Sequence, residues 1–315
     1  MTPIATLFES EAAAPLFELT PIGDGFAAEI SGVVLSEDLP AAVIEAIEKA
    51  IANYGVLVFR DQPLTEDEQV RFAERFGPLD AGLRKINGKT ATSSSAPAYR
   101  LKHNALADIS NVGPNDKVVQ RDDPRIVSNI ANQLWHSDSS FQKPAARYSM
   151  LYALAVPPRG GDTQFADMRA AYDQLDDDLK MEIADFEAEH FALHSRIMLG
   201  ATGWTPEQVA AMPPVSWPLV RTHPLSGRKL LFIGAHATHI PGLTVSEGRM
   251  LLQGLLEHAT QPAFVYTHKW RVNDLVIWDN RATLHRGRRF DYQVRREMRR
   301  STTSDDCPHV SQPDA

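Results

Sequence analysis

The sequence predicts a β-rich fold with flanking helices, arranged as a double-sheet jelly roll rather than an alternating α/β sheet. From about residue 145 onward, short apolar or alternating runs recur between clusters of Pro, Gly, Asp and Asn, which is typical of strands. Helical patterns interrupt these runs only at 168–189 and 244–259. A β core with helices outside it accounts for both observations.

The first expected elements are a helix and a short strand. Apolar residues with helical spacing predict a helix over 36–53, which Ser36 could cap. Gly55 ends that pattern, and the apolar run 56–59 indicates a short buried strand.

A second helix is expected to begin at a capping box. Thr65 and Glu68 have the spacing that lets the two side chains cap each other's backbone N–H groups. The pair Gly77-Pro78 should end this helix, because proline cannot continue it.

Residues 80–130 form the least regular part of the sequence. A strand is expected at Ala107–Val112, and the polar stretch 84–104 predicts a long loop. Such loops are often lids or binding loops. Lys85 and Lys117 could reach a substrate from this region, although surface lysines usually do not.

The later strands follow the same alternation. They are expected at Tyr148–Val156, Leu219–His223, Lys229–Ile233, Ala263–His268, Leu275–Trp278 and Met298–Thr303. With 315 residues and 43% hydrophobic content, the chain can bury one large core. We therefore expect one domain over 1–315, with the first ~15 residues and the tail after 306 loosely held.

Composition and charge exclude several classes of function. The net charge is −8, from 32 basic and 40 acidic residues, which disfavours non-specific binding to nucleic acid or membranes. No apolar run approaches the ~20 residues of a membrane helix. The N-terminus lacks the pattern of a secretory signal, so a cytoplasmic location is expected. The single cysteine, Cys307, excludes an intrachain disulfide and a Cys-based metal site. Nothing in the sequence sets an oligomeric state, and a homo-oligomer remains open.

The first candidate for metal binding is the pair His136-Ser137-Asp138. In an extended segment, residues i and i+2 point to the same side, so this imidazole and this carboxylate could grip one ion. A distant histidine would complete a facial triad, which leaves open positions on Fe(II) for oxygen chemistry. Taken alone the pair is weak, because a turn histidine bonded to a nearby acid gives the same pattern.

His285 is the best candidate for the third ligand. It ends the segment 275–284, a strand followed by polar residues, and a strand end that faces a pocket suits a metal ligand. Asp279 and Asn280 could supply the hydrogen bonds that orient a ligand. Four other histidines show no such arrangement and are interpreted as structural or substrate-proximal: His190, His194, His236 and His239.

Seven arginines lie between Arg286 and Arg300. They could form a solvated charged face, a nucleic-acid patch or a site for carboxylates, and the acidic total disfavours the second. If 295–302 is a strand, Arg296 and Arg300 face the same way, roughly 13 Å apart. Buried arginines are costly without anionic partners, so one could hold a co-substrate and the other a second anion.

These features resemble the TauD/TfdA family of Fe(II)/2-oxoglutarate dioxygenases. The shared pattern is His-x-Asp, a distant histidine and an arginine eleven residues later (296 − 285). The resemblance runs from about Gly55 to Asp306 and is strongest to the branch that acts on 2,4-dichlorophenoxyacetate. It rests on LADISNV (106–112), ANQLWHSDSSFQKPAARYSML (131–151), GGDTQFADMRAAYD (160–173), MPPVSWPLVRTHPLSGRKLLFIGAHA (212–237), EGRMLL (247–252), LLEHAT (255–260), WDNRATLHRGRRFD (278–291) and RREMRRSTT (295–303).

The resemblance implies a role for each matching residue. It implies three iron ligands, which are His136, Asp138 and His285. It further implies that Arg296 and Thr163 bind the distal carboxylate of 2-oxoglutarate. Arg300 would meet the acidic head of the prime substrate, and Asn132 would line the substrate pocket. The implied core is a double-stranded β-helix, a jelly-roll form. The loop 84–104 is longer than expected for the branch, which leaves the substrate open.

The implied reaction consumes O2 and 2-oxoglutarate, with ascorbate in support, and hydroxylates an acidic organic substrate. An aryloxyacetate would fall apart to a phenol and glyoxylate, with release of succinate and CO2. Three alternatives remain: a taurine or alkyl sulfate dioxygenase of the same family, a jelly-roll binding protein or sensor that holds a metal without turnover, and a zinc hydrolase. The retained Arg296 and Thr163 disfavour the second, and the lack of an obvious general base disfavours the third.

Overall fold

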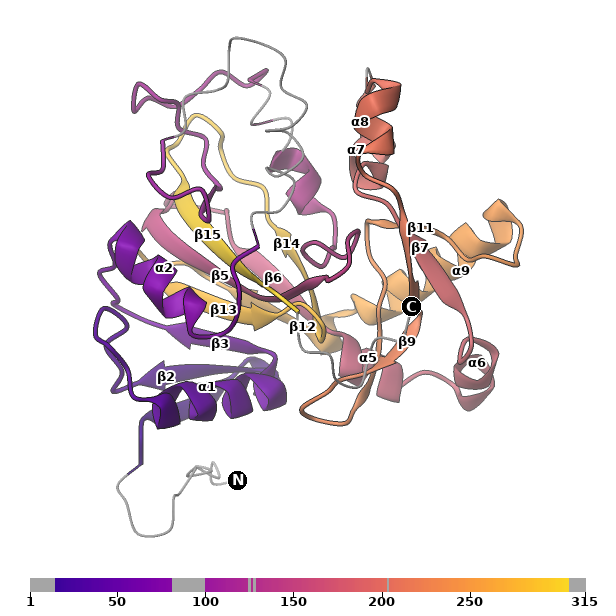
Figure 1. Ribbon diagram of the computed structural model, residues 1–315, viewed down its shortest axis with the longest axis horizontal. Coiled ribbons are helices and arrows are strands. Elements are labelled where there is room, and N and C mark those ends of the chain that lie inside the picture. The colour runs from indigo at the N-terminus through magenta and orange to yellow at the C-terminus, as the bar shows by residue number, and fades with distance from the viewer. Residues whose placement is uncertain (1–14, 81–99, 124–125, 127–128, 203, 306–315) are drawn as a thin grey trace.

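The computed structural model describes residues 15–80, 100–123, 126, 129–202 and 204–305 (Figure 1). The prediction of a β-rich fold with flanking helices is confirmed. The strands are β1 (Glu18–Ile22), β2 (Ala27–Ser31), β3 (Val56–Phe59), β4 (Ala107–Asp108), β5 (Ala146–Ala155), β6 (Thr163–Asp167), β7 (Glu187–His190), β8 (Val215–Pro218), β9 (Val220–Thr222), β10 (Lys229–Leu231), β11 (Ala237–His239), β12 (Val265–His268), β13 (Leu275–Asp279), β14 (Thr283–Gly287) and β15 (Glu297–Ser304).

The helices flank the sheets. They are α1 (Ala41–Tyr54), α2 (Glu66–Glu74), α5 (Met168–Asp173), α6 (Asp177–Glu182), α7 (His194–Met198), α8 (Pro206–Ala210) and α9 (Val245–Ala259), with single 3-10 turns at η1 (Gly23–Gly25), η2 (Ala131–Gln133) and η3 (Pro262–Phe264). In the parts of the chain that the structure describes, none of these helices has the length and hydropathy needed to cross a membrane.

A seven-stranded sheet forms one half of the molecule, in the order β1-β2-β3-β13-β5-β15-β4. Only β2 and β3 pair in parallel, and the other neighbours are antiparallel. Strand β13 lies between β3 and β5 and is buried along its whole length. This explains its continuous apolar run, because both of its faces pack against other elements.

Alternate residues of this sheet enter two different cores. Leu275 and Ile277 of β13 pack toward α1 and α2, which lie together at one side of the sheet in Figure 1. Val276 and Trp278 point the other way and pack with Phe165 of β6. The sheet thus has a face covered by helices and a face directed toward the smaller sheets.

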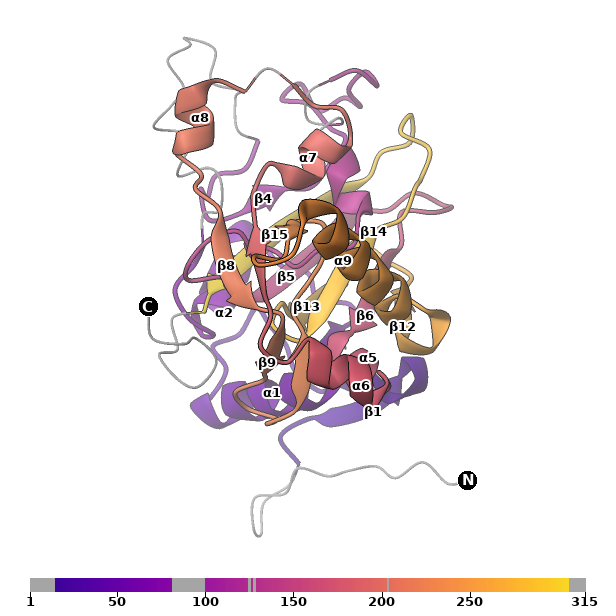
Figure 2. The same ribbon diagram turned by 90° about the vertical axis from the view of Figure 1, so that its right-hand side faces the viewer.

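The smaller sheets complete the β structure. Strand β6 lies between β12 and β14, strand β7 lies between β11 and β8, and β9 pairs with β10. Helix α9 packs beside β11 and α5, on the side of the molecule opposite α1 and α2 (Figures 1 and 2). The sheet β12-β6-β14 therefore lies between the large sheet and a second apolar core.

Most expected strands are confirmed to within two residues, and the helix at 244–259 is α9. The capping box of Thr65 and Glu68 is present at the start of α2. The prediction that Ser36 caps the first helix is wrong. Helix α1 begins five residues later, directly after Pro40, whose fixed φ suits a helix start.

Two further expectations are corrected. The predicted helix over 168–189 consists of α5, α6 and the strand β7, which pairs with β8 and β11. Of the expected strand at 107–112, only β4 forms. The expected strand at 275–278 is β13, after which Asn280 and Arg281 turn the chain into β14 of another sheet.

Some expectations fall outside the described residues. These are the loose N-terminal segment up to residue 14, the tail after 306, Lys85 and residues 84–99 of the long loop. Lys117 is described and is exposed.

Candidate metal centre and adjoining anion pocket

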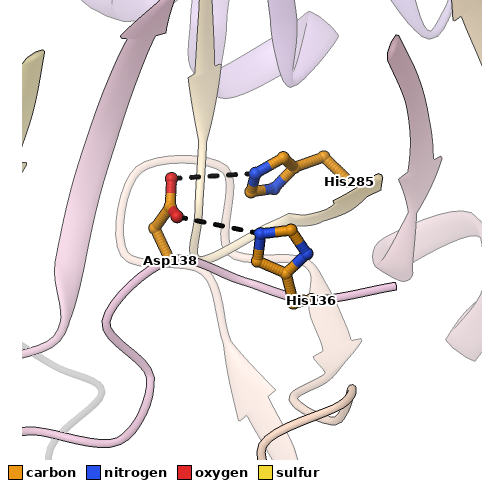
Figure 3. A group of neighbouring side chains, drawn as sticks. All are labelled: His136, Asp138 and His285. Carbon is orange, nitrogen blue, oxygen red and sulfur yellow. Dashed lines mark ion pairs between the residues drawn. The ribbon is translucent and has the colours of Figure 1, made fainter. Parts of the chain in front are cut away.

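Two distant segments bring the candidate metal ligands together. His136 follows η2, and its backbone forms an isolated antiparallel bridge with His285 on β14. The two N–H···O bonds of this bridge measure 3.0 and 2.8 Å. Asp138 lies two residues further along, and its carboxylate reaches both rings (Figure 3). His285 therefore lies within a strand and not at a strand end, which corrects the expectation.

The three side chains converge on one point. Asp138 Oδ1 lies 3.9 Å from His136 Nε2, and Asp138 Oδ2 lies 3.7 Å from His285 Nε2 (Figure 3). One donor atom of each residue lies within 4.8 Å of the others, and all three residues are buried. This spacing is short enough for a single metal ion to bridge the three donors.

The chemistry of the donors also fits a metal. His136 Nδ1 donates to Leu134 O at 2.8 Å, so the lone pair of Nε2 is directed at the site. Burial lowers the pKa of His136, and the pKa of His285 lies well below its usual value for the same reason. Both rings are thus neutral near pH 7, which is the form that binds metals.

Asp138 is held by a network of hydrogen bonds. Ser149 Oγ donates to Asp138 Oδ2 at 2.7 Å, and Arg300 donates to Oδ1 at 2.5 Å. Asn280 accepts from the backbone N–H of Asp138 and donates to Ser149. Burial alone would raise the pKa of Asp138, but the charge of the neighbouring Arg300 guanidinium opposes it and helps to hold the pKa well below its usual range.

Asn280 therefore orients a candidate ligand, as the sequence suggested. Asp279 does not: it pairs with Arg281 and His223, away from the metal ligands. Its function is structural, because its carboxylate and the Arg281 guanidinium neutralise each other in the core.

A cavity opens beside the candidate metal ligands. Its walls come from β5, β6, β13, β14, β15, the 109–111 segment and η2 with the residues before it. The sequence-predicted residues that line it are His136, His285, Thr163, Arg296, Arg300 and Asn132. The seventh residue, Asp138, bonds to Arg300 in the cavity wall. The structure thus brings together around one cavity all seven residues singled out from the sequence.

Arg296 is suited to bind an anion. Its side chain is buried, and Nε and a terminal nitrogen donate only to the carbonyl of Gly161, at 3.3 and 3.2 Å. Among the described residues no carboxylate lies within ion-pair distance of it. Burial lowers its pKa to about 10, so it remains charged near pH 7. A buried cation in this state requires an anionic partner.

Thr163 lines the same cavity at the start of β6. Its Oγ1 accepts a hydrogen bond from Trp270 Nε1 at 3.0 Å. The hydroxyl hydrogen is left available for a ligand, so Thr163 can donate to the anion that Arg296 attracts.

Arg300 in β15 and Arg296 just before this strand both line the cavity, whereas Arg299 contacts α2 on the other side. Arg300 Nε is buried without a hydrogen-bond partner in the described structure. Because Arg300 lines the cavity, its guanidinium can meet a second anion there while it bonds to Asp138.

Among the described residues, the four other histidines singled out from the sequence and Lys117 lie outside the candidate metal group. His190 ends β7, and His194 begins α7, so the two do not share a helix. His236 is buried, with its ring centroid 6.2 Å from that of His136, so it lies near the metal ligands. Lys117 is absent from the lining of the cavity.

Sequence reasoning missed several residues of the cavity wall. Tyr292, Phe290 and Trp278 line it, as does the buried amide of Asn111. The motif LADISNV contains Asn111, but no local signal in it points to a cavity some 180 residues away in sequence.

Two imidazoles and one carboxylate beside a pocket for anions are the arrangement used by mononuclear non-haem iron oxygenases. The class that the fold and the site define is thus a β-rich, metal-dependent oxygenase. Comparison with known families agrees. The family described as "Taurine catabolism dioxygenase TauD, TfdA family" matches residues 18–302, and the chain belongs to this family.

Individual relatives are similar over nearly their full length. The chain is 57% identical to the alpha-ketoglutarate-dependent 2,4-dichlorophenoxyacetate dioxygenase of Cupriavidus pinatubonensis, covering 91% of this chain and 97% of the relative. It is 37% identical to the (S)-phenoxypropionate/alpha-ketoglutarate-dioxygenase of Sphingobium herbicidovorans, over 93% and 96%. Among solved structures, AAD-2 in complex with Mn(II) and N-oxalylglycine matches with a TM-score of 0.85 and 43% identity, over 91% and 97%.

Proposed function

We propose that this protein is an Fe(II)- and 2-oxoglutarate-dependent dioxygenase that cleaves an aryloxyacetate such as 2,4-dichlorophenoxyacetate. The observation that carries the proposal is the buried group of His136, Asp138 and His285, which adjoins the same cavity as Arg296 and Arg300. The 57% identity to a dioxygenase named for this substrate and for alpha-ketoglutarate, another name for 2-oxoglutarate, supports both the co-substrate and the substrate class.

In this proposal the three candidate ligands hold the metal through His136 Nε2, His285 Nε2 and a carboxylate oxygen of Asp138. The Arg296 guanidinium and the Thr163 hydroxyl hold the distal carboxylate of 2-oxoglutarate. When bound, iron and 2-oxoglutarate activate O2, so that one oxygen atom enters a C–H bond of the substrate. Ascorbate supports the reaction as a reductant that keeps the metal ferrous.

The protein's own residues orient the prime substrate. Arg300 would bind the substrate carboxylate through its guanidinium, which lines the cavity. Ile109, Leu151 and Trp278 give the cavity an apolar wall that suits an aromatic ring and excludes water, and Asn132 lines the polar side. A carboxylate fixed at Arg300 would direct the adjacent CH2 group toward the metal.

The products follow from the position of the hydroxylation. A hydroxyl group placed on the carbon between the ether oxygen and the carboxylate makes a hemiacetal. Its C–O bond then breaks to give a phenol and glyoxylate, while 2-oxoglutarate leaves as succinate and CO2. Phenol release therefore reports on the site of attack as well as on turnover.

We also propose that residues 1–315 form one domain whose core is the double-stranded β-helix form of the jelly roll. The contact of Phe165 on β6 with Trp278 on β13, with ring centroids 5.4 Å apart, supports two sheets that face each other. The proposed partner is a small acidic molecule, and the net charge of −8 argues against nucleic acid.

Oxygen consumption tests the function directly. Purified protein with Fe(II), ascorbate and 2-oxoglutarate is assayed with 2,4-dichlorophenoxyacetate, an aryloxypropionate, taurine or no prime substrate. The proposal expects uptake stimulated by the aryloxyacetate, with one phenol and one succinate for each O2. Stimulation by taurine alone would replace the substrate class, and hydroxylated substrate without free phenol would contradict the cleavage. Absence of any uptake by the iron-loaded protein would favour a binding protein.

A further inference from the structure

Arg296 does not reach the cavity unaided, because it lies at the end of the turn that joins β14 to β15. This turn leaves β14 just after His285 and returns through Phe290 and Tyr292 before β15 begins. Both aromatic residues line the cavity with Arg296. The position of the guanidinium therefore depends on how the turn 288–296 is held.

One side chain from a distant segment holds this turn. The Asn111 amide nitrogen donates to the carbonyl oxygens of Tyr292 and Val294, each at 2.8 Å. Its Oδ1 accepts from the backbone N–H of Arg296, also at 2.8 Å. The backbone N–H of Asn111 donates to the carbonyl of Arg296 at 3.2 Å, so both backbone polar groups of Arg296 bind to one residue.

These bonds use both N–H donors of the amide and its carbonyl oxygen. An asparagine side chain offers two N–H donors and one carbonyl acceptor, and here each has a partner on the same turn. Asn111 is 2% exposed, so water does not substitute for these bonds. Neither an acid, which lacks the donors, nor an aliphatic side chain can reproduce the pattern.

The turn is held at a second point from the other side of the cavity. Gln133 Nε2 donates to the hydroxyl of Tyr292 at 2.7 Å, and Gln133 belongs to η2, three residues before His136. Tyr292 is thus fixed at its backbone by Asn111 and at its ring by Gln133. The ring and the Arg296 guanidinium are presented to the cavity as one unit.

We propose that Asn111 is a positioning residue for the 2-oxoglutarate site, which holds Arg296 and Tyr292 in the geometry that receives the co-substrate. This inference rests on the proposed function, because it takes 2-oxoglutarate as the ligand of Arg296. Asn111 touches neither the candidate metal ligands nor Arg300. Its effect should therefore fall on the co-substrate and spare the metal and the prime substrate.

The test measures binding as well as turnover. Mn(II)-loaded wild-type protein and the variants Asn111→Asp and Asn111→Ser are titrated calorimetrically with 2-oxoglutarate in the absence of O2. Asn111→Asp keeps the shape and the acceptor but loses both donors, and Asn111→Ser shortens the side chain without adding charge. The matched control is Asn115→Asp, the same change at an exposed residue of the same segment, whose Oδ1 accepts only from the nearby Lys117 N–H.

We expect the Kd for 2-oxoglutarate to rise by about 10- to 100-fold in both Asn111 variants, as for other residues that orient a binding group. The KM for 2-oxoglutarate should rise in parallel, while kcat at saturating 2-oxoglutarate and the affinity for Mn(II) stay near those of the wild type. Asn115→Asp should match the wild type throughout.

Unchanged 2-oxoglutarate affinity in either folded Asn111 variant would overturn the inference. It would also be overturned if affinity for Mn(II), 2-oxoglutarate and aryloxyacetate fell together, because Asn111 would then act only on general stability. If the wild-type protein bound no 2-oxoglutarate, the proposed function itself would fail. The two failures are therefore distinguishable by the wild-type titration.

Discussion

Arg299 in β15 and Arg296 just before this strand are both buried, but they lie in two regions with different partners. On the face covered by helices, Arg299 donates to Gln69 Oε1 at 2.7 Å and to the carbonyl of Leu64, and its guanidinium lies 4.7 Å from the ring centre of Tyr152. Beside the cavity, Arg296 donates twice to a single carbonyl, that of Gly161, and its guanidinium lies 5.6 Å from the ring centre of Phe290. The hydrogen bonds of Arg299 thus reach two acceptors, whereas those of Arg296 share one.

The difference shows where the fold tolerates the free-energy cost of a buried charge. Burying a charge is unfavourable unless it is paired or well hydrogen-bonded. Gln69 is fully buried and also bonds to Ser301, so the helix-covered face satisfies its own polar groups. On the cavity face, Arg300 Nε has no hydrogen-bond partner in the described structure, and Arg296 donates to one carbonyl oxygen. The rule that a buried charge needs partners is broken at the cavity, where a ligand can supply the missing partner.

The largest effect should come from removing a candidate metal ligand. We expect His136→Ala to lower turnover by roughly 1000-fold or more, about 4 kcal/mol of transition-state stabilisation, because the metal would lose one of three donors. Calorimetric titration with Mn(II) measures the loss of metal binding without turnover. His239→Ala is the control, since that histidine lies on β11 and contacts Thr238 instead. Retained Mn(II) affinity in His136→Ala would exclude this residue as a ligand.

Arg296→Gln tests the cavity side of the comparison. We expect the KM for 2-oxoglutarate to rise by about 100-fold, equivalent to about 2.7 kcal/mol, because a charged hydrogen-bond partner of the distal carboxylate is lost. The free energy of unfolding without ligand should stay constant or increase, since an under-partnered buried charge is removed. Steady-state kinetics and denaturant unfolding measure the two quantities. A strongly destabilised variant with unchanged KM would reverse the interpretation.

Arg299→Gln tests the helix-covered side and should give the opposite pattern. We expect the free energy of unfolding to fall by about 2 kcal/mol, because Gln69 Oε1 and the Leu64 carbonyl lose a buried donor. The KM for 2-oxoglutarate should stay near the wild-type value. The matched pair of Arg→Gln variants thus separates a ligand-binding arginine from a structural one three residues away in sequence. A large rise in KM with Arg299→Gln would remove the distinction.

The sequence predicted the parts of the site that depend on local spacing. His136 and Asp138 share a segment, and Arg296 and Arg300, predicted to face the same way, both line the cavity. It also predicted β13, because a strand buried on both faces leaves an uninterrupted apolar run. In these cases the physical constraint acts between residues that are close in sequence.

Where long-range pairing decides the structure, the sequence reasoning failed. The segment 187–190 has a helical pattern, but pairing with β8 and β11 makes it the strand β7. The turn at Asn280 places His285 within β14, in a different sheet from β13, whereas the sequence reasoning placed it at a strand end. Asn111 holds a turn about 180 residues away, and neither segment carries a local signal of that contact.

The smallest effect concerns α2, which supplies Gln69 to the helix-covered face. Thr65→Ala removes the hydroxyl that accepts from the Glu68 N–H at 3.3 Å and donates to the Glu68 carboxylate at 2.7 Å. We expect a loss of about 1 kcal/mol in the free energy of unfolding, the usual value of an N-cap. The KM for 2-oxoglutarate should not change, because the cap acts on the face away from the cavity. Thr205→Ala, at the equivalent cap of the exposed helix α8, is the control and should cost less, since α8 buries no side chain. Equal losses at the two caps would mean that α2 adds nothing to the support of β15 beyond its own helical stability.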